Sequence, residues 1–81
     1  MDKAALEIRK KLKKMPPKSA IEYVKSFELP EEEELFIIEC DIRKKSIVAL
    51  SMQNAVSTVT VSRRRQDGYA KMTWDKLHTL Q

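Results

Sequence analysis

The chain has 81 residues, 42% of them hydrophobic, and a formal net charge of +4. This length suffices for one domain with a modest core but not for a second domain or a cleft between domains. Cys40 is the only cysteine, so no disulfide framework or multi-cysteine metal site can form within the chain. No apolar run approaches the roughly 20 residues that cross a bilayer, and charges up to Lys14 leave no signal-peptide core. We therefore expect a cytoplasmic protein without membrane contact.

Charge is distributed unevenly along the chain. Residues 1–40 hold eight Lys/Arg against nine Asp/Glu, whereas residues 41–81 hold eight against three. Because the phosphate backbone of DNA is polyanionic and binding releases its counterions, a basic half is the footprint expected of a nucleic-acid-binding protein. Many basic proteins bind nothing in particular, so the charge supports this interpretation without establishing it.

The first 28 residues are predicted to form a pair of helices. Apolar residues recur at helical spacing between residues 3 and 15, and lysines and arginines cover most of the remaining surface. Two prolines end this helix, and Ser19 with Glu22 three residues later forms the capping box of a second one. The basic first helix is compatible with RNA or membrane binding, but its thin apolar stripe lacks an aromatic anchor, which favours packing on the domain.

Two further helices are expected before residue 54. Pro30 opens the third helix, because proline is favoured in the first helical turn, and the glutamates at 31–34 place negative charge where the helix dipole is positive. The polar run at 41–45 predicts a loop. Ser46 then caps a fourth helix that runs through Gln53.

A fifth helix follows after a very short connection. Residues 54–56 are too few for a loop and enough for a tight turn, and Ser57 has the side chain to cap a new helix. This helix should reach at least Gln66. Asp67 and Gly68 either end it or only weaken it, since glycine inside a helix costs about 1 kcal/mol.

The last part of the chain, residues 73–81, is predicted to form a short helix capped by Thr73 and carrying Trp74, Leu77 and Leu80. One alternative remains open earlier in the chain. Residues 57–62 alternate polar and β-branched side chains, which by propensity favours a strand. A lone strand would lack a partner, so a helix is more consistent with its neighbours.

The expected fold is therefore an all-α single domain of five or six helices. It consists of an N-terminal helical pair at 1–28, a helix-turn-helix core at 29–72 and a short C-terminal helix at 73–81. The core is assigned because two helices joined by a turn of three or four residues make a helix-turn-helix.

A set of residues after residue 28 follows a known spacing without a gap, namely Leu29, Pro30, Glu33, Ser46, Leu50, Val56, Ser57, Thr60, Val61 and Arg64. This pattern resembles the region-four DNA-binding domain of bacterial sigma factors and the related small regulators of phages and mobile elements. Ala55 stands where that family usually has the glycine of the turn. The resemblance implies a helix-turn-helix regulator of transcription.

The candidate DNA-contacting residues are hydroxyls and cations in or near the proposed recognition helix. They are Lys44, Lys45, Ser57, Thr58, Thr60, Ser62, Arg63, Arg64 and Arg65. The hydroxyl residues near the helix start suit base or phosphate contacts, with capping and solvation as the alternative. The two lysines precede the helix that crosses the DNA backbone and either contact phosphate or are solvated.

The three consecutive arginines sweep about 200° of a helix, so they cannot all face one groove. We expect at least two to reach DNA, with an ordinary solvated face as the alternative. Val61 should be core, whereas Val59, on another face, is less certain.

The predicted function is sequence-specific binding of double-stranded DNA, with the helix from Ser57 in the major groove. One domain reads a single half-site, so a homodimer or larger assembly is expected for high specificity. The alternative is a protein-interaction module that docks on RNA polymerase or another regulator. No catalytic motif, metal-ligand set or cofactor motif is evident, since Gly68 is the only glycine and successive glutamates at 31–34 cannot converge on one ion.

Overall fold

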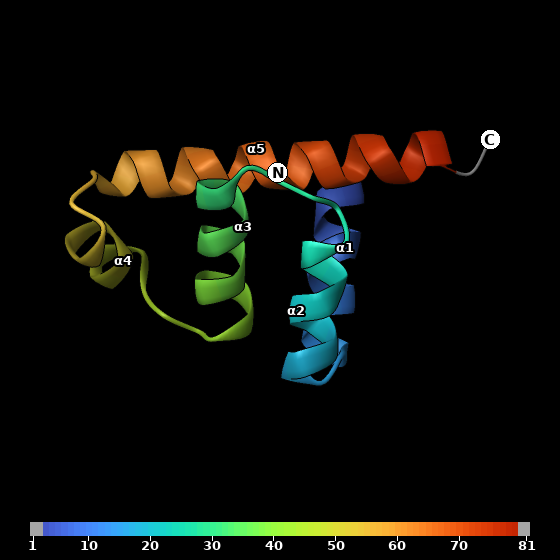
Figure 1. Ribbon diagram of the computed structural model, residues 1–81, viewed down its shortest axis with the longest axis horizontal. Coiled ribbons are helices and arrows are strands. Elements are labelled where there is room, and N and C mark those ends of the chain that lie inside the picture. The colour runs from blue at the N-terminus through green and yellow to red at the C-terminus, as the bar shows by residue number, and fades with distance from the viewer. Residues whose placement is uncertain (1–2, 80–81) are drawn as a thin grey trace.

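The computed structural model describes the backbone of residues 3–79 and the side chains of residues 3–75. Its elements are α1 (Lys3–Lys14), α2 (Pro17–Lys25), α3 (Glu31–Ile37), a π-helical turn η1 (Ile38–Ile42), α4 (Ile47–Gln53) and α5 (Thr58–Thr79). Figure 1 shows α5 running along the molecule, with α4, α3 and the pair of α1 and α2 on one side of it. No strand occurs in the described range, so the all-α prediction is confirmed.

The start of α2 differs from the sequence prediction. Pro16 occupies the N-cap position and Pro17 the first helical position, where a missing backbone N–H costs nothing. Ser19 consequently lies inside the helix, and no side chain caps this helix start. The predicted capping box of Ser19 and Glu22 is therefore wrong, because the prolines fix the helix start earlier.

The predicted loop at 41–45 is wrong in its first residues, because α3 continues through η1 to residue 42. Asp41 is buried, and its carboxylate accepts hydrogen bonds from the Tyr69 hydroxyl at 2.6 Å and the Arg65 guanidinium at 2.7 Å. Arg9 of α1 lies 3.5 Å from the same carboxylate. The polar run conceals this burial, because the partners on α5 are 24 and 28 residues away.

The predicted caps of α4 and α5 are confirmed. Ser46 Oγ accepts a hydrogen bond from the Ala49 amide at 3.0 Å, and Ser57 Oγ accepts one from the Thr60 amide at 3.1 Å. Residues 58–62 form the first turns of α5 and not a strand. Val61 is buried as expected, so capping and burial override the β-propensity of this segment.

Helix α5 continues without a break through Gly68 to Thr79. Thr73 lies inside it, so no separate helix starts there, and the side chains of Leu77 and Leu80 fall outside the described residues. A Cβ atom added to Gly68 would stand 2.5 Å from the Ile37 Cδ1 atom of α3. The glycine thus lets α3 approach α5 closely and does not end the helix.

Two apolar clusters hold the helices together. The larger one joins α1, α2 and the α3–η1 segment to Tyr69 and Met72 in the second half of α5. The smaller one consists of Phe36, Leu50 and Val61, from α3, α4 and the start of α5. The pair of α4 and α5 is therefore positioned on α3 by its own small core.

Candidate nucleic-acid interface

A turn of four residues, 54–57, separates α4 from α5. It is closed by a hydrogen bond from the Val56 amide to the Ser51 carbonyl at 3.0 Å and by one from Asn54 Nδ2 to the Leu50 carbonyl at 2.9 Å. Ala55 has φ +54, a left-handed conformation that glycine adopts more readily. The backbone of the turn thus reverses direction at Ala55 through this left-handed residue.

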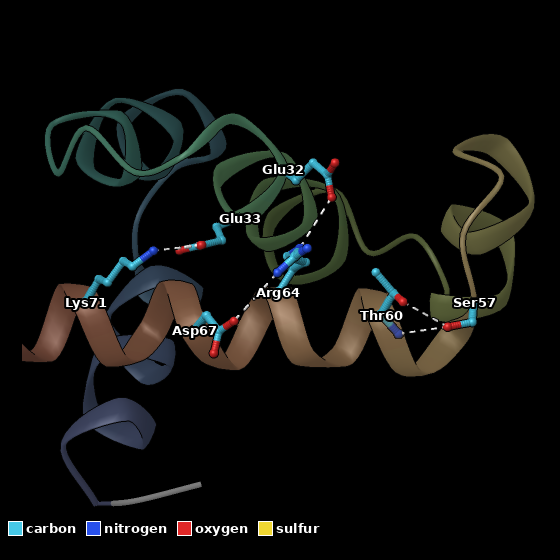
Figure 2. Close-up of polar contacts among 7 residues, drawn as sticks. All are labelled: Glu32, Glu33, Ser57, Thr60, Arg64, Asp67 and Lys71. Carbon is cyan, nitrogen blue, oxygen red and sulfur yellow. Dashed lines mark hydrogen bonds and ion pairs between the residues drawn. The ribbon is translucent and has the colours of Figure 1, made fainter.

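The hydroxyl residues at the start of α5 divide into two groups. Ser57 and Thr60 are committed to the helix start, since their hydroxyl oxygens lie 2.9 Å apart and Ser57 also caps the helix (Figure 2). Thr58 is exposed and Ser62 half-buried. Thr58 and Ser62 are therefore the better placed of the four to contact a ligand.

Arg65 is not available to DNA in this structure. Its side chain is only 14% exposed and is bonded to the buried Asp41 at 2.7 Å. Burial lowers the pKa of Arg65, but the hydrogen bond and charge of Asp41 outweigh it and hold the pKa above its ordinary value. In this structure the Arg65 guanidinium is therefore engaged by an interior carboxylate.

Arg64 turns toward α3 and not outward. Its guanidinium lies 3.4 Å from the Glu32 carboxylate and 4.0 Å from that of Asp67. About two turns further along α5, Lys71 pairs with the buried Glu33 at 2.8 Å. Figure 2 shows Arg64 and Lys71 facing the acidic first turn of α3, so the glutamates at 31–34 include two ion-pair acceptors.

The two lysines before α4 also have intramolecular partners. Lys45 pairs with the buried Glu39 at 3.0 Å, and Arg43 lies 3.6 Å from the same carboxylate. Lys44 donates to the Asp41 carbonyl at 3.1 Å. These contacts close the connection between η1 and α4. The Glu39 carboxylate offsets the charge of Lys45, whereas Lys44 is held by a neutral carbonyl.

Among the three arginines, only Arg63 has no carboxylate or other partner within the part of the chain that the structure describes. It is exposed and shares one helix face with Val59 and Gln66, four residues before it and three after it. Both neighbours are exposed. We call Val59, Arg63 and Gln66 the outer row of α5.

The sequence prediction placed Val59 on another helix face than Val61 but included neither Val59 nor Gln66 among the DNA-contacting candidates. Their spacing from Arg63 was the available signal, since residues three and four apart share a helix face. The signal becomes decisive once Val61 is known to face the core, because the outer row then lies on the opposite side of the helix.

Neither metal chemistry nor an activated thiol is supported by the described residues. No group of three or more His, Cys, Asp or Glu side chains among them could hold a metal ion. Burial raises the pKa of the Cys40 thiol above its ordinary value, which disfavours the nucleophilic thiolate. Nor is any described helix long and apolar enough to cross a membrane.

Comparisons with protein-family models, curated proteins and solved structures find no match to this chain. The interface is consequently defined by the geometry of α4, the turn and α5. Its distinguishing features are the left-handed turn, the capped helix start and an outer row whose arginine has no partner among residues 3–75.

Proposed function

We propose that α4, the turn and α5 act as a helix-turn-helix that binds double-stranded DNA, with the first turns of α5 in the major groove. The observation that carries this proposal is the outer row of Val59, Arg63 and Gln66 near the start of a capped helix. Its side chains are exposed, and Arg63 has no partner among the described residues.

Each member of the outer row matches a chemical feature of the major groove. An arginine can donate two hydrogen bonds to guanine, a glutamine can pair with the N6 and N7 atoms of adenine, and an apolar side chain can contact the thymine methyl group. Thr58 and Ser62 flank the row and suit phosphate oxygens, which accept hydrogen bonds from hydroxyls. The proposed specificity therefore belongs to the outer row and not to the run of three arginines.

The proposal also draws on the resemblance to region four of sigma factors. The left-handed Ala55 lies at the family's glycine position, and two serine caps begin the two helices. One outer row would read only a few base pairs, so we propose that a homodimer binds paired half-sites. A transcriptional regulator is the role that this mode of binding suits best.

The proposal is tested by selecting bound duplexes from a random pool and measuring affinity for the selected duplex by fluorescence anisotropy. Loss of a bidentate base contact costs about 1–3 kcal/mol, so Arg63→Ala should weaken binding roughly 5- to 150-fold. The matched control is Arg64→Ala, which removes the same group from a side chain that faces α3, and it should change affinity far less. Absence of wild-type binding at about 50 mM salt, where electrostatic attraction is strong, would reject the proposal.

A second candidate function is a protein-interaction module that docks on RNA polymerase or another regulator. The observation that favours it lies on α4, where Val48 and Met52 are 59% and 77% exposed and share one helix face. Exposed apolar pairs suit a protein surface better than a phosphate backbone. Val48→Ser with Met52→Ser should abolish binding to purified RNA polymerase and leave DNA affinity unchanged if this surface serves a protein partner.

A further inference from the structure

Helix α1 has one face in the core and the opposite face in water. Ala5, Ile8 and Leu12 are buried in the larger apolar cluster. The opposite face carries lysines at positions 3, 10, 13 and 14, all of them exposed. We call these four residues the α1 lysine row.

The α1 lysine row has no counter-charge among the described residues. None of its members forms an ion pair or hydrogen bond with any described residue, and the single acid of the helix, Glu7, pairs with none of them. The two other cations of α1 are engaged, since Arg9 lies 3.5 Å from Asp41 and Lys11 lies 4.7 Å from the centre of the Tyr23 ring. The structure therefore separates the engaged cations of α1 from the free ones.

We propose that the α1 lysine row is a second DNA-contacting surface, which binds backbone phosphates without reading sequence. This inference rests on the proposed DNA-binding function and extends it. A lysine ammonium is a compact point charge without the planar fork that recognises a base edge, so the row adds affinity by releasing counterions. The outer row of α5 then selects the sequence.

The position of the row suits a contact away from the recognition segment. Helix α1 packs beside Tyr69 and Met72 of α5, which follow Arg63 by six and nine residues. At a rise of 1.5 Å per residue this is about 9–14 Å along the helix axis. Figure 1 shows α1 and α4 toward opposite ends of α5, so the α1 lysine row and the outer row are offset along the axis of α5.

A polyphosphate backbone fits this face better than a lipid bilayer. Interfacial membrane helices insert an apolar face that carries residues such as Trp, Phe and Leu. The apolar face of α1 is buried in the protein, and Leu6 is the only large apolar side chain of α1 that is exposed. The free charges of α1 thus lack the apolar insertion that a membrane surface requires.

The test compares two variants that each remove two exposed, unpaired lysines. Lys10→Gln with Lys14→Gln alters the α1 lysine row, and Lys18→Gln with Lys25→Gln removes the same charge from α2. Affinity for the selected duplex is measured at several salt concentrations. Each lost phosphate contact lowers the slope of log K against log salt by about 0.9, so we expect a decrease of about 1.8 for the α1 variant only.

The outcomes separate this inference from the proposed function. An unchanged slope in the α1 variant, or an equal decrease in both variants, overturns the α1 contact and leaves the function of α5 intact. Failure of the wild type to bind any duplex overturns both proposals. Anionic phosphatidylserine vesicles serve as a further probe, and loss of vesicle binding in the α1 variant without a change of DNA slope would assign the row to membranes instead. Circular dichroism of each variant verifies that the helices remain folded.

Discussion

Helices α1 and α5 both carry clustered basic residues, but these residues differ in whether a carboxylate lies beside them. On α1, four lysines face water without an acidic partner among the described residues. On α5, Arg64, Arg65 and Lys71 each meet a carboxylate from α3 or η1. The contrast teaches that basic residues in a sequence are not equivalent to available positive charge, because tertiary ion pairs decide how much charge remains for a partner.

The three consecutive arginines show this in graded form. Arg63 is unpaired among the described residues, Arg64 is 44% exposed beside Glu32, and Arg65 is 14% exposed on a buried carboxylate. An exposed pair contributes about 0–1 kcal/mol and can be exchanged for a phosphate. A buried pair cannot be broken cheaply, because one desolvated charge would be left alone. Accessibility to DNA therefore falls from Arg63 to Arg65.

The largest expected effect is a loss of stability when the buried ion pair of Asp41 and Arg65 is broken. Asp41→Asn leaves Arg65 without its counter-charge, so we expect the free energy of unfolding to fall by about 3 kcal/mol or more. The measurement is urea unfolding followed by circular dichroism. The control Glu22→Gln, at an exposed position without an ion pair, should stay within about 0.5 kcal/mol of the wild type. Equal stability of the two variants would contradict the assignment of Asp41 as a structural centre.

A smaller effect is expected where α3 meets α5. Gly68→Val places a branched side chain against Ile37, whose Cδ1 atom is 2.5 Å from the position of an added Cβ. Ala70 is exposed on the same helix, so Ala70→Val measures the helix propensity of valine without overpacking. Glycine is about 1 kcal/mol worse than alanine inside a helix, so propensity alone would make Gly68→Val about 1 kcal/mol less harmful than Ala70→Val. Overpacking a close contact costs about 1–3 kcal/mol, so we expect Gly68→Val to lose about 1 kcal/mol more than Ala70→Val in urea unfolding. A Gly68→Val variant about 1 kcal/mol more stable than Ala70→Val would show that the side chain of Ile37 yields without cost.

The smallest expected effect concerns Arg64 and DNA affinity. Glu32→Gln removes the nearer of its two carboxylate partners, at 3.4 Å, and leaves Asp67 at 4.0 Å, so the guanidinium becomes more available to phosphate. We expect affinity for the selected duplex to rise about threefold, within the range of 0–1 kcal/mol that exposed pairs contribute. Glu22→Gln removes one negative charge elsewhere and should raise it less in the same anisotropy titration. An equal increase in both would mean that net charge acts and Arg64 does not.

The sequence predicted the local features of the fold correctly where a short-range interaction determines them. Ser46 and Ser57 cap helices three residues before the amides that they accept from, and Val61 is buried as its position on α5 predicts. The capping box at Ser19 failed because the neighbouring prolines fixed the start of α2 first. In these cases the helix start depends only on nearby residues, such as a capping serine or a proline, so it can be predicted by comparing neighbouring positions in the sequence.

The candidate site was harder to predict, because its charges pair over long distances in the sequence. Averaging charge over each half made residues 41–81 look basic, but Glu32, Glu33 and Glu39 of the first half neutralise cations of the second. The same averaging concealed the α1 lysine row, because acids on other helices balanced it in number without contacting it. The sequence likewise does not show that Arg63 is exposed and Arg65 half-buried, because both belong to one run of three arginines.

The helical class of the chain, its helix-starting serines and the turn between α4 and α5 follow from the sequence, because capping, periodicity and proline geometry act over a few residues. The packing of the helices was needed to show which cations lack a carboxylate partner, that Gly68 lies where α3 meets α5, and that Asp41 is buried. These outcomes depend on contacts between residues that lie 24 to 38 positions apart. Such contacts form only when the helices have packed.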